Sequence, residues 1–342
     1  MMGDGVNADP FGHVMVLGAG AWGTALAVHL ARAGRRVTLW ARSPALADEM
    51  NERRENPAYL PDVPLPDGLA ATSDAGTIAE VDAALCVIPA QHMRAQLGAF
   101  AAAAGDRPLP VALCSKGIEQ STGLLMHDVL SEVWPRAGGA VLSGPSFAAD
   151  VARGLPTAVT LADADEERGA RWGTTLATSG FRPYYSADVR GVELGGAYKN
   201  VLAIACGVVE GRDLGNSAKA ALMARGFAEC MRFAGALGAR PETLNGLSGL
   251  GDIILTCSSR QSRNMSLGYE IGKGRRAATV LAERHSVAEG AATAPILTAL
   301  AAEKGVDVPV ANAVVTLLEG KAPVDDVMEA LMTRPLKPEL SS

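Results

Sequence analysis

Residues 13–24 read HVMVLGAGAWGT, an apolar strand that runs directly into the spacing Gly-x-Gly-x-x-Gly. A helical stretch follows, and residues 36–40 supply the next strand. Gly18 permits the tight turn, Gly20 lets a pyrophosphate approach the backbone, and Gly23 lets the helix pack closely on the strand. The free N–H groups at the start of the helix then face an anion. In this context the stretch predicts a dinucleotide-binding site rather than a merely structural turn.

The end of the second strand indicates which dinucleotide is bound. A site for NAD usually places Asp or Glu about 20 residues beyond the first glycine, where it bonds the ribose 2′-hydroxyl. Residues 38–44 read TLWARSP, and the first acid is Asp48. Arg42 offers a charged fork and Ser43 a hydroxyl, which suit a 2′-phosphate. The pattern favours NADP(H) and leaves NAD(H) open, and the alternative is a solvated Arg42 in a surface loop.

Composition limits the class of protein. The length of 342 residues predicts two domains, and 48% hydrophobic with 20% charged residues is typical of globular proteins. A net charge of −6 without a dense Lys/Arg run argues against a nucleic-acid partner. No apolar stretch reaches the roughly 18 residues of a membrane span. The five cysteines and five histidines lack metal-ligand spacing, which predicts reduced thiols, a cytoplasmic location and no metal site.

Strand and helix patterns alternate through the first half of the chain and predict an α/β fold with a Rossmann-like, doubly wound sheet. Near residue 188 only helical periodicity remains, which predicts an all-α C-terminal domain. We therefore expect a flexible tail at 1–12, a dinucleotide-binding domain at 13–188 and a helical substrate-binding and catalytic domain at 189–335. Further strands are expected at 83–88, 109–114, 140–142, 157–161 and 181–185, a Pro-rich loop at 56–67, and helices at 190–209, 217–238 (capped by Asn216 or Ser217), 264–273, 287–304, 310–319 and 324–332.

Three loops follow strands of the predicted parallel sheet and carry notable residues. They are residues 88–90, 115–117 and 143–147. Right-handed crossovers bring the carboxyl ends of parallel strands to one edge of a sheet. We therefore expect these three loops to lie along the crevice in which such folds bind their ligands.

The helix expected from Val192 to Val209 is apolar on nearly every side, which predicts that it is buried. Lys199 and Asn200 lie within it. A buried lysine is costly unless it is paired, and burial lowers its pKa toward the range useful for proton transfer. We interpret Lys199 as a functional group, and the alternative is a side chain that extends to solvent.

Residues 246–257, GLSGLGDIILTC, form a second group with three glycines in its first six positions. Glycines permit close approaches of the backbone that other residues resist. Asp252 and Thr256 share one face if the segment is helical, and Asp252 could then pair with Lys199 and orient it. The alternative is a helix cap followed by an ordinary polar residue.

Two further groups precede helices. Residues 258–264, SSRQSRN, place hydroxyl, guanidinium and amide groups before a helix N-terminus, which suits a phosphate. A solvated polar loop fits the same pattern. Residues 286–290, SVAEG, begin another helix, and Glu289 is either a cap or a contact to the cofactor.

Together these groups resemble the bacterial-type NAD(P)-dependent sn-glycerol-3-phosphate dehydrogenases over essentially the whole chain beyond the tail. Gly-x-Gly-x-x-Gly is shared by many dehydrogenases, whereas KN, GLGD and SRN in this order are highly specific. The matching segments are GAGAWGTALA (18–27), CSKGIE (114–119), SGPSFA (143–148), LGGAYKNVLAIA (194–205), GLGDIILTC (249–257) and SRN (262–264).

The resemblance implies reversible hydride transfer between sn-glycerol 3-phosphate and dihydroxyacetone phosphate, which supplies glycerol 3-phosphate for phospholipids, and a homodimer. It implies that Lys199 is the proton donor and acceptor, with Asp252 and Thr256 in support. The substrate-binding residues that it implies are Lys116, Gly144, Ser146, Lys199, Asn200, Asp252, Ser262, Arg263 and Asn264. The cofactor-binding residues are Gly18, Gly20, Ala21, Trp22, Gly23, Arg42, Lys116, Ala148, Arg263, Val287 and Glu289.

Two other functions fit parts of the sequence. A dehydrogenase of the same architecture that acts on another small hydroxy acid would share the glycine-rich turn but would lack the GLGD and SRN segments. A catalytically inactive NADP-binding sensor would need the dinucleotide fingerprint but would not need Lys199 in a buried helix.

Overall fold

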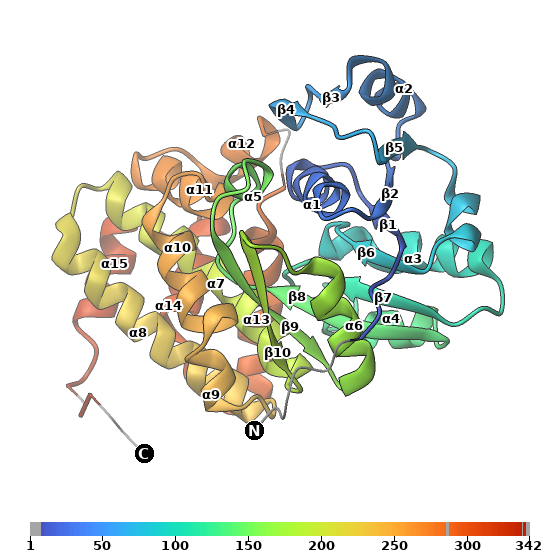
Figure 1. Ribbon diagram of the computed structural model, residues 1–342. Coiled ribbons are helices and arrows are strands. Elements are labelled where there is room, and N and C mark those ends of the chain that lie inside the picture. Colours follow the sequence, from blue (N-terminus) through green and yellow to red (C-terminus); the bar gives the residue numbers. More distant parts are fainter. Residues whose placement is uncertain (1–7, 285–286, 337, 340–342) are drawn as a thin grey trace.

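The computed structural model describes residues 8–284, 287–336 and 338–339. It has an eight-stranded sheet with helices on both faces, and a second group of helices lies against the β8–β10 end of that sheet (Figure 1). The last strand ends at Ser186, and from Val189 onward the elements are helical. The expected fold class is confirmed. We call residues 8–186 the sheet half and residues 189–336 the helical half.

Both faces of the sheet are buried. Along the first strand, Val14 and Val16 belong to one apolar cluster, and Met15 and Leu17 belong to another on the opposite face. Such alternation between two cores is typical of a doubly wound sheet. The strands are β1 (His13–Leu17), β2 (Arg36–Trp40), β5 (Leu69–Thr72), β6 (Ala83–Cys86), β7 (Leu109–Leu113), β8 (Ala137–Ser143), β9 (Thr157–Asp163) and β10 (Phe181–Ser186), in the order β10-β9-β8-β7-β6-β1-β2-β5 across the sheet.

β9 departs from the parallel arrangement that a doubly wound sheet predicts, because it runs antiparallel to β8. The connection between them contains only the five-residue helix α5 (Ala148–Ala152). Such a helix spans about 7 Å, whereas a seven-residue strand spans about 23 Å, so this helix is too short to carry the chain back along β8, as the helix of a parallel crossover does. β6, β7 and β8 are parallel to one another, and the loops that follow them therefore lie along one edge.

Helices cover the two faces of the sheet. One face packs against α1 (Ala21–Arg32) and α6 (Glu166–Leu176), and the other against α3 (Ala90–Ala104) and α4 (Met126–Val133). The loop expected at 56–67 instead contains most of a small hairpin, whose very short strands leave little alternation to detect. The remaining elements of this half are α2 (Pro44–Arg53), β3 (Glu55–Asn56), β4 (Leu60–Pro64) and a 3-10 turn (Ala75–Glu80).

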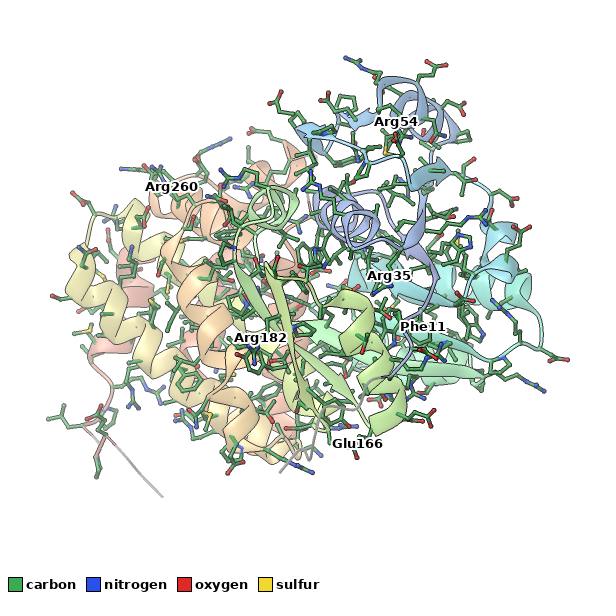
Figure 2. The ribbon with its side chains drawn as sticks, in the orientation of Figure 1. Phe11, Arg35, Arg54, Glu166, Arg182 and Arg260 are labelled. Carbon is green, nitrogen blue, oxygen red and sulfur yellow. The ribbon has the colours of Figure 1, made fainter. Side chains whose placement is uncertain are left out.

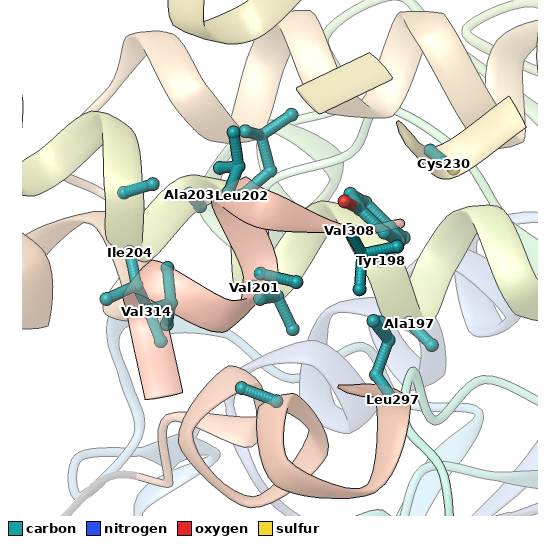
Figure 3. Packing of buried hydrophobic residues seen from close by; sticks show 14 of the residues in the cluster. Ala197, Tyr198, Val201, Leu202, Ala203, Ile204, Cys230, Leu297, Val308 and Val314 are labelled. Atoms are coloured by element: carbon teal, nitrogen blue, oxygen red, sulfur yellow. The ribbon is translucent and has the colours of Figure 1, made fainter. Parts of the chain in front are cut away.

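α7 (Val189–Gly211) forms the core of the helical half. Its length and composition would suffice to cross a membrane, but 94% of its most apolar window is buried inside the structure. Ala197 and Val201 of this helix lie among side chains from other helices, including Leu297 and Val314 (Figure 3). The surrounding elements are α8 (Gly215–Ala236), α9 (Pro241–Leu244), a π-helical segment (Leu247–Gly251), α10 (Asp252–Ser258), α11 (Arg263–Gly272), α12 (Ala277–Ala282), α13 (Glu289–Glu303), α14 (Pro309–Leu318) and α15 (Val324–Met332).

The cap expected for α8 is wrong. The helix begins at Gly215 and is preceded by Leu214, so Asn216 and Ser217 lie inside its first turn and neither side chain caps it. Gly215 has a φ of 84°, a value that glycine adopts without strain, and the chain therefore turns into the helix before Asn216 is reached.

α7 and α11 lie in backbone contact, which fixes the start of α11 beside the middle of α7. A Cβ atom on Gly207 of α7 would stand 2.1 Å from the carbonyl oxygen of Met265. A Cβ atom on Gly268 of α11 would stand 1.9 Å from the carbonyl oxygen of Ile204. Only glycine permits this approach, so the Gly-x-x-x-Gly spacing in each helix sets the distance between them.

Glu193 of α7 joins the two halves of the molecule. Its Oε1 accepts a hydrogen bond of 2.9 Å from the backbone N–H of His127 and so caps α4, whose own preceding residue, Leu125, cannot do so. Burial raises the pKa of Glu193 to about 8, against the backbone hydrogen bonds that favour its ionised form. The folded protein therefore holds a proton that the unfolded chain, with a glutamate pKa of about 4.3, releases.

The contribution of Glu193 to stability is expected to be fully present below pH 4 and to decline as pH rises toward 8, because ionisation is harder in the folded state. Glu193→Gln keeps an acceptor oxygen and cannot ionise. Thermal unfolding from pH 5 to 9 should show the variant gaining stability relative to wild type as pH rises. Glu52→Gln, at an exposed position of α2, is the control and should show no such trend. A relative stability that falls with pH would mean that capping of α4 by the carboxylate outweighs its burial.

Candidate active site

Lys199 lies in the buried middle of α7 and is paired with α10. Its Nζ donates to Oδ1 of Asp252 at 2.6 Å and to Oγ1 of Thr256 at 3.0 Å. Asp252 and Thr256 are four residues apart on α10, and the Thr256 hydroxyl donates in turn to the same carboxylate oxygen at 3.2 Å. Asp252 is 1% exposed and Lys199 7%. The lysine is buried rather than extended to solvent, and Asp252 pairs with it instead of serving as a helix cap.

A second lysine shares the same carboxylate. Lys116, in the loop after β7, donates from Nζ to Oδ2 of Asp252 at 2.8 Å and to the carbonyl oxygen of Gly144 at 3.4 Å. Asp252 thus holds one ammonium group on each oxygen, which leaves a buried cluster with one net positive charge. The sequence indicated Lys116 and Asp252 separately, but their pairing across 136 residues could not be found in a local pattern.

The surroundings set the protonation of these groups. Burial lowers the pKa of Lys199 to about 8, with the charge of Lys116 acting in the same direction and Asp252 opposing both. Burial disfavours the ionised form of Asp252, but Lys116 and Lys199 outweigh this and hold the pKa of Asp252 below its usual range. Asp252 is therefore ionised near neutral pH, and Lys199 can exist in both of its protonation states there.

Close backbone contacts bring α10 to α7. A Cβ atom on Gly195 of α7 would stand 2.8 Å from the carbonyl oxygen of Ser248, and one on Gly249 would stand 2.0 Å from the carbonyl oxygen of Leu244. The π-helical segment packs into this space and leads directly into Asp252. The glycine-rich sequence before Asp252 therefore serves to deliver its carboxylate to Lys199.

A chain of amide hydrogen bonds extends the site. Asn200 donates from Nδ2 to the carbonyl oxygen of Lys116 at 3.0 Å and accepts on Oδ1 from Nδ2 of Asn264 at 2.9 Å. Asn264 accepts on Oδ1 from the backbone N–H of Gly290 at 2.9 Å. The chain joins the loop after β7 to α7, α11 and α13. Each Nδ2 donates one hydrogen bond, so one amide hydrogen of Asn200 and one of Asn264 have no partner among the described residues.

The first residues of α11 divide into a buried and an exposed set. Ser262 is buried and caps the helix, with its Oγ accepting from the backbone N–H of Met265 at 3.3 Å. Arg263 is exposed, and its guanidinium has no hydrogen-bond or ion-pair partner among the described residues. Arg260 points outward at the periphery of the helical half (Figure 2), where it stacks 4.8 Å from the ring centre of Tyr269. Of the two arginines, only Arg263 is available at the helix N-terminus.

The loop after β8 contributes Gly144 and Ser146. Gly144 has a φ of 142°, and a Cβ atom there would stand 2.9 Å from Cα of Val159, so the loop is held tightly against β9. The Ser146 hydroxyl donates to the carbonyl oxygen of Gly144 at 3.0 Å. Since Gly144 also receives Lys116, this loop borders the charged cluster.

The glycine-rich turn after β1 has the form that a pyrophosphate needs. Gly18 has a φ of 120°, and a Cβ atom on Gly23 would stand 1.8 Å from the carbonyl oxygen of Gly18, so both are required by the protein itself. A Cβ atom on Gly20 would meet nothing within 4 Å. Gly20 precedes α1, whose first residues Ala21 and Trp22 have no side-chain cap. The open space at Gly20 and the uncapped N–H groups fit a bound anion.

The end of β2 separates Arg42 from Ser43. The Ser43 hydroxyl is already used to cap α2, where it accepts from the backbone N–H of Leu46 at 3.4 Å. Arg42 is exposed at the carboxyl end of β2. Neighbouring strands lie about 4.8 Å apart, so the three intervals from β7 to β2 place the segments that carry Lys116 and Arg42 about 14 Å apart along one edge of the sheet.

Glu289 begins α13 and binds the other half of the molecule. Its Oε1 accepts a hydrogen bond of 3.0 Å from the backbone N–H of Ala90, the first residue of α3. Burial raises the pKa of Glu289, while the N–H of Ala90 and the charges of Arg263 and Lys116 oppose the shift. Through Oε1, Glu289 thus caps α3 rather than its own helix.

The remaining expected positions are more peripheral. Ala148 is the first residue of α5, and Val287 is 42% exposed. Ser286, which opens the SVAEG segment, lies outside the described residues. Within the described residues no group of three or more His, Cys, Asp or Glu side chains is arranged to hold a metal ion.

Models of both parts of one family match this chain. The N-terminal part of NAD-dependent glycerol-3-phosphate dehydrogenase matches residues 13–169, and the C-terminal part matches residues 188–329. A relative from Novosphingobium aromaticivorans, named glycerol-3-phosphate dehydrogenase (NAD(P)+), is 56% identical over 327 residues, which are 95% of this chain and 98% of the relative. The crystal structure of glycerol-3-phosphate dehydrogenase from Coxiella burnetii has a TM-score of 0.90 at 35% identity and covers 94% of this chain and 99% of its own.

A more distant structure shows how far the architecture is shared. A ketopantoate reductase from Ralstonia eutropha has a TM-score of 0.59 at 18% identity over 92% of this chain and 99% of its own, which shows a common fold alone. The resemblance found in the sequence is therefore confirmed by the full-length relatives. With both halves matched, the chain belongs to the NAD-dependent glycerol-3-phosphate dehydrogenase family.

Proposed function

We propose that this chain catalyses reversible hydride transfer between a nicotinamide cofactor and C2 of sn-glycerol 3-phosphate, which interconverts that substrate with dihydroxyacetone phosphate. The observation that carries the proposal is the buried Lys199, paired with Asp252 and Thr256 and holding a pKa of about 8. The family supplies the substrate, and the site supplies the proton-transfer group that the reaction needs.

Lys199 moves the proton. NAD(P)H, when bound, supplies the hydride to C2 of dihydroxyacetone phosphate. A protonated Lys199 has three N–H groups, of which Asp252 and Thr256 take two, so the third is free to donate to the substrate oxygen. That donation converts the carbonyl to an alcohol and leaves Lys199 neutral. In the oxidising direction neutral Lys199 accepts the same proton.

Asp252 positions Lys199 and compensates its charge, and Lys116 adds positive charge beside it. The Asp252 carboxylate holds the ammonium group in place and keeps a buried cation compensated. Lys116 takes the second carboxylate oxygen and adds positive charge near the substrate oxygen as negative charge develops on it. Thr256 fixes the direction of the lysine Nζ by accepting one of its hydrogens.

The substrate phosphate is assigned to the N-terminus of α11. Arg263 offers a planar fork for two charge-assisted hydrogen bonds, and the backbone N–H groups at the start of a helix favour an anion. Ser262 and Asn264 flank it. We place four residues beside the glycerol part of the substrate because they border the charged cluster: Gly144, Ser146, Lys116 and Asn200.

The cofactor is assigned to the carboxyl edge of the sheet. Gly20, with its open surroundings, admits the pyrophosphate, between Gly18 and Gly23, which shape the turn. Arg42 is exposed where a 2′-phosphate would lie, which favours NADP(H) over NAD(H). The further residues that we assign to the cofactor are Ala21, Trp22, Lys116, Ala148, Arg263, Val287 and Glu289.

This division of labour gives two domains: residues 13–188 hold the dinucleotide and residues 189–335 provide catalysis and substrate binding. We further propose a cytoplasmic homodimer, formed through the helical half, that supplies glycerol 3-phosphate for phospholipids. The inactive-sensor alternative leaves Lys199, Asp252 and Lys116 without a use, since burying three charges costs free energy that cofactor binding alone does not require.

The pH dependence of both directions tests Lys199. Above pH 7 the substrate phosphate stays a dianion, because its second pKa is about 6. The value of kcat/KM for dihydroxyacetone phosphate should be level up to pH 8 and fall above it, because reduction needs the protonated lysine. The value for glycerol 3-phosphate should rise up to the same pH. Lys199→Ala should lower turnover by about 10²- to 10⁴-fold in both directions and retain cofactor binding. Near-normal turnover in that variant would remove Lys199 from the mechanism.

Arg42→Ala tests the choice of cofactor. The affinity for NADPH, measured by fluorescence titration, should fall by about tenfold or more, because a charge-assisted fork to the 2′-phosphate is lost. The affinity for NADH should change little. Arg53→Ala, which removes the same charge from an exposed pair with Glu49 on α2, is the matched control and should alter neither affinity. Equal losses for both cofactors in Arg42→Ala would rule out the 2′-phosphate contact.

Arg263 variants test the grip on the substrate phosphate. Arg263→Lys should raise KM for dihydroxyacetone phosphate clearly and Arg263→Ala further, because lysine cannot reproduce the planar fork. Both variants should lose preference for the phosphorylated substrate over dihydroxyacetone itself. Arg260→Ala, three residues before Arg263 and turned outward, should behave as wild type. NADPH binding is measured in each variant, and an unchanged preference in Arg263→Ala would place the phosphate elsewhere.

A further inference from the structure

Arg284, in the connection between α12 and α13, donates hydrogen bonds to the first turn of α11. Its Nη1 donates to the backbone carbonyl oxygen of Arg263 at 2.8 Å, and its Nη2 donates to Oγ of Ser266 at 2.9 Å. Arg263 and Ser266 are three residues apart and therefore share a face of α11. One guanidinium thus spans one helical turn at the end where we place the substrate phosphate.

The first turn of a helix is held less firmly than the interior, because its N–H groups have no partners within the helix. In α11 the Ser262 side chain accepts a hydrogen bond from one of these groups, the backbone N–H of Met265. Arg284 adds two charge-assisted bonds, which are stronger than neutral ones, on another part of the same turn. The carbonyl of Arg263 can accept Arg284 and an N–H of the helix together, since it has two lone pairs.

We propose that Arg284 is a positioning residue for the substrate phosphate, which acts by holding the backbone of Arg263 so that its guanidinium starts from a fixed place. The proposal rests on the assignment of Arg263 to the phosphate made above. A displacement of about 1 Å in a positioning group is enough to cost a large factor in rate. Arg284 does not touch the substrate, and its effect passes through Arg263.

A second explanation is that the charge of Arg284 simply attracts the phosphate. The two explanations differ for Arg284→Lys, which keeps the positive charge but offers a single ammonium in place of a planar fork. Under the positioning proposal, lysine restores little, because it cannot bridge the Arg263 carbonyl and the Ser266 hydroxyl in the same way. Under simple attraction, lysine restores the wild-type behaviour.

The first experiment measures kcat and KM for dihydroxyacetone phosphate at saturating NADPH. Arg284→Ala should raise KM by about 10-fold with a smaller change in kcat, Arg284→Lys should stay within about threefold of Arg284→Ala, and Ser266→Ala should raise KM by about two- to threefold. Arg275→Ala removes the same charge from a nearby exposed arginine, which pairs with Glu270 and Glu283, and should leave KM unchanged. Thermal unfolding of each variant shows whether it remains folded at the assay temperature. Full recovery in Arg284→Lys, or a wild-type KM in Arg284→Ala, would overturn the proposal.

A double-mutant cycle tests whether Arg284 acts through Arg263. If it does, Arg284→Ala should have almost no further effect on kcat/KM in an Arg263→Ala background. Effects that multiply in the double variant would overturn the proposal. The cycle also separates the two assignments. A raised KM in Arg263→Ala with a wild-type KM in Arg284→Ala would contradict only the role of Arg284. A wild-type KM in Arg263→Ala would contradict both the phosphate assignment and the role of Arg284.

Discussion

The carboxylate of Asp252 carries an ammonium group on each of its two oxygens, and the geometry of the site depends on this sharing. Lys199 comes from α7, 53 residues away, and Lys116 comes from the loop after β7, 136 residues away. All three groups are largely buried, so removing the carboxylate would leave two ammonium groups facing each other with little solvent. Breaking a buried pair in this way is strongly destabilising. The same interaction therefore joins the two halves of the molecule and fixes the position of Lys199, which we propose to be the proton-transfer group.

Glycine contacts make this sharing geometrically possible. α7 and α11 touch through their backbones at Gly207 and Gly268, and the segment before Asp252 packs against α7 at Gly195. Side chains at these positions would hold the helices apart, and the hydrogen bonds of the site, most of which are between 2.6 and 3.0 Å, could not form. Precision in the polar site is thus a consequence of small residues in the helical core. The glutamates that cap helices of the other half, the buried Glu193 and the half-buried Glu289, add to the same rigidity.

The charge at the site is opposite in sign to the net charge of the whole chain. The chain carries a net charge of −6, yet the cluster at Asp252 has one net positive charge, and Arg263 and Arg284 lie at the start of α11. A local group of positive charges in an acidic protein can attract an anion to one place without giving the whole surface an affinity for polyanions. Burial of the cluster also shields it from salt, so we expect proton transfer to depend less on ionic strength than substrate capture does.

Local patterns in the sequence were sufficient for the dinucleotide turn, the burial of Lys199 and the helical half, because a glycine spacing or an apolar periodicity acts over a few residues. The relation of Asp252 to Thr256 was also predictable, since both lie on one helix. The antiparallel direction of β9, the second lysine on Asp252 and the fork from Arg284 to α11 were not. They depend on the path of the connection between β8 and β9 and on which distant segments pack together. A local periodicity in the sequence does not indicate contacts between residues far apart in the chain. The sequence thus specifies the helices and strands and their buried faces. Tertiary packing decides which of the charged side chains come within pairing distance of one another.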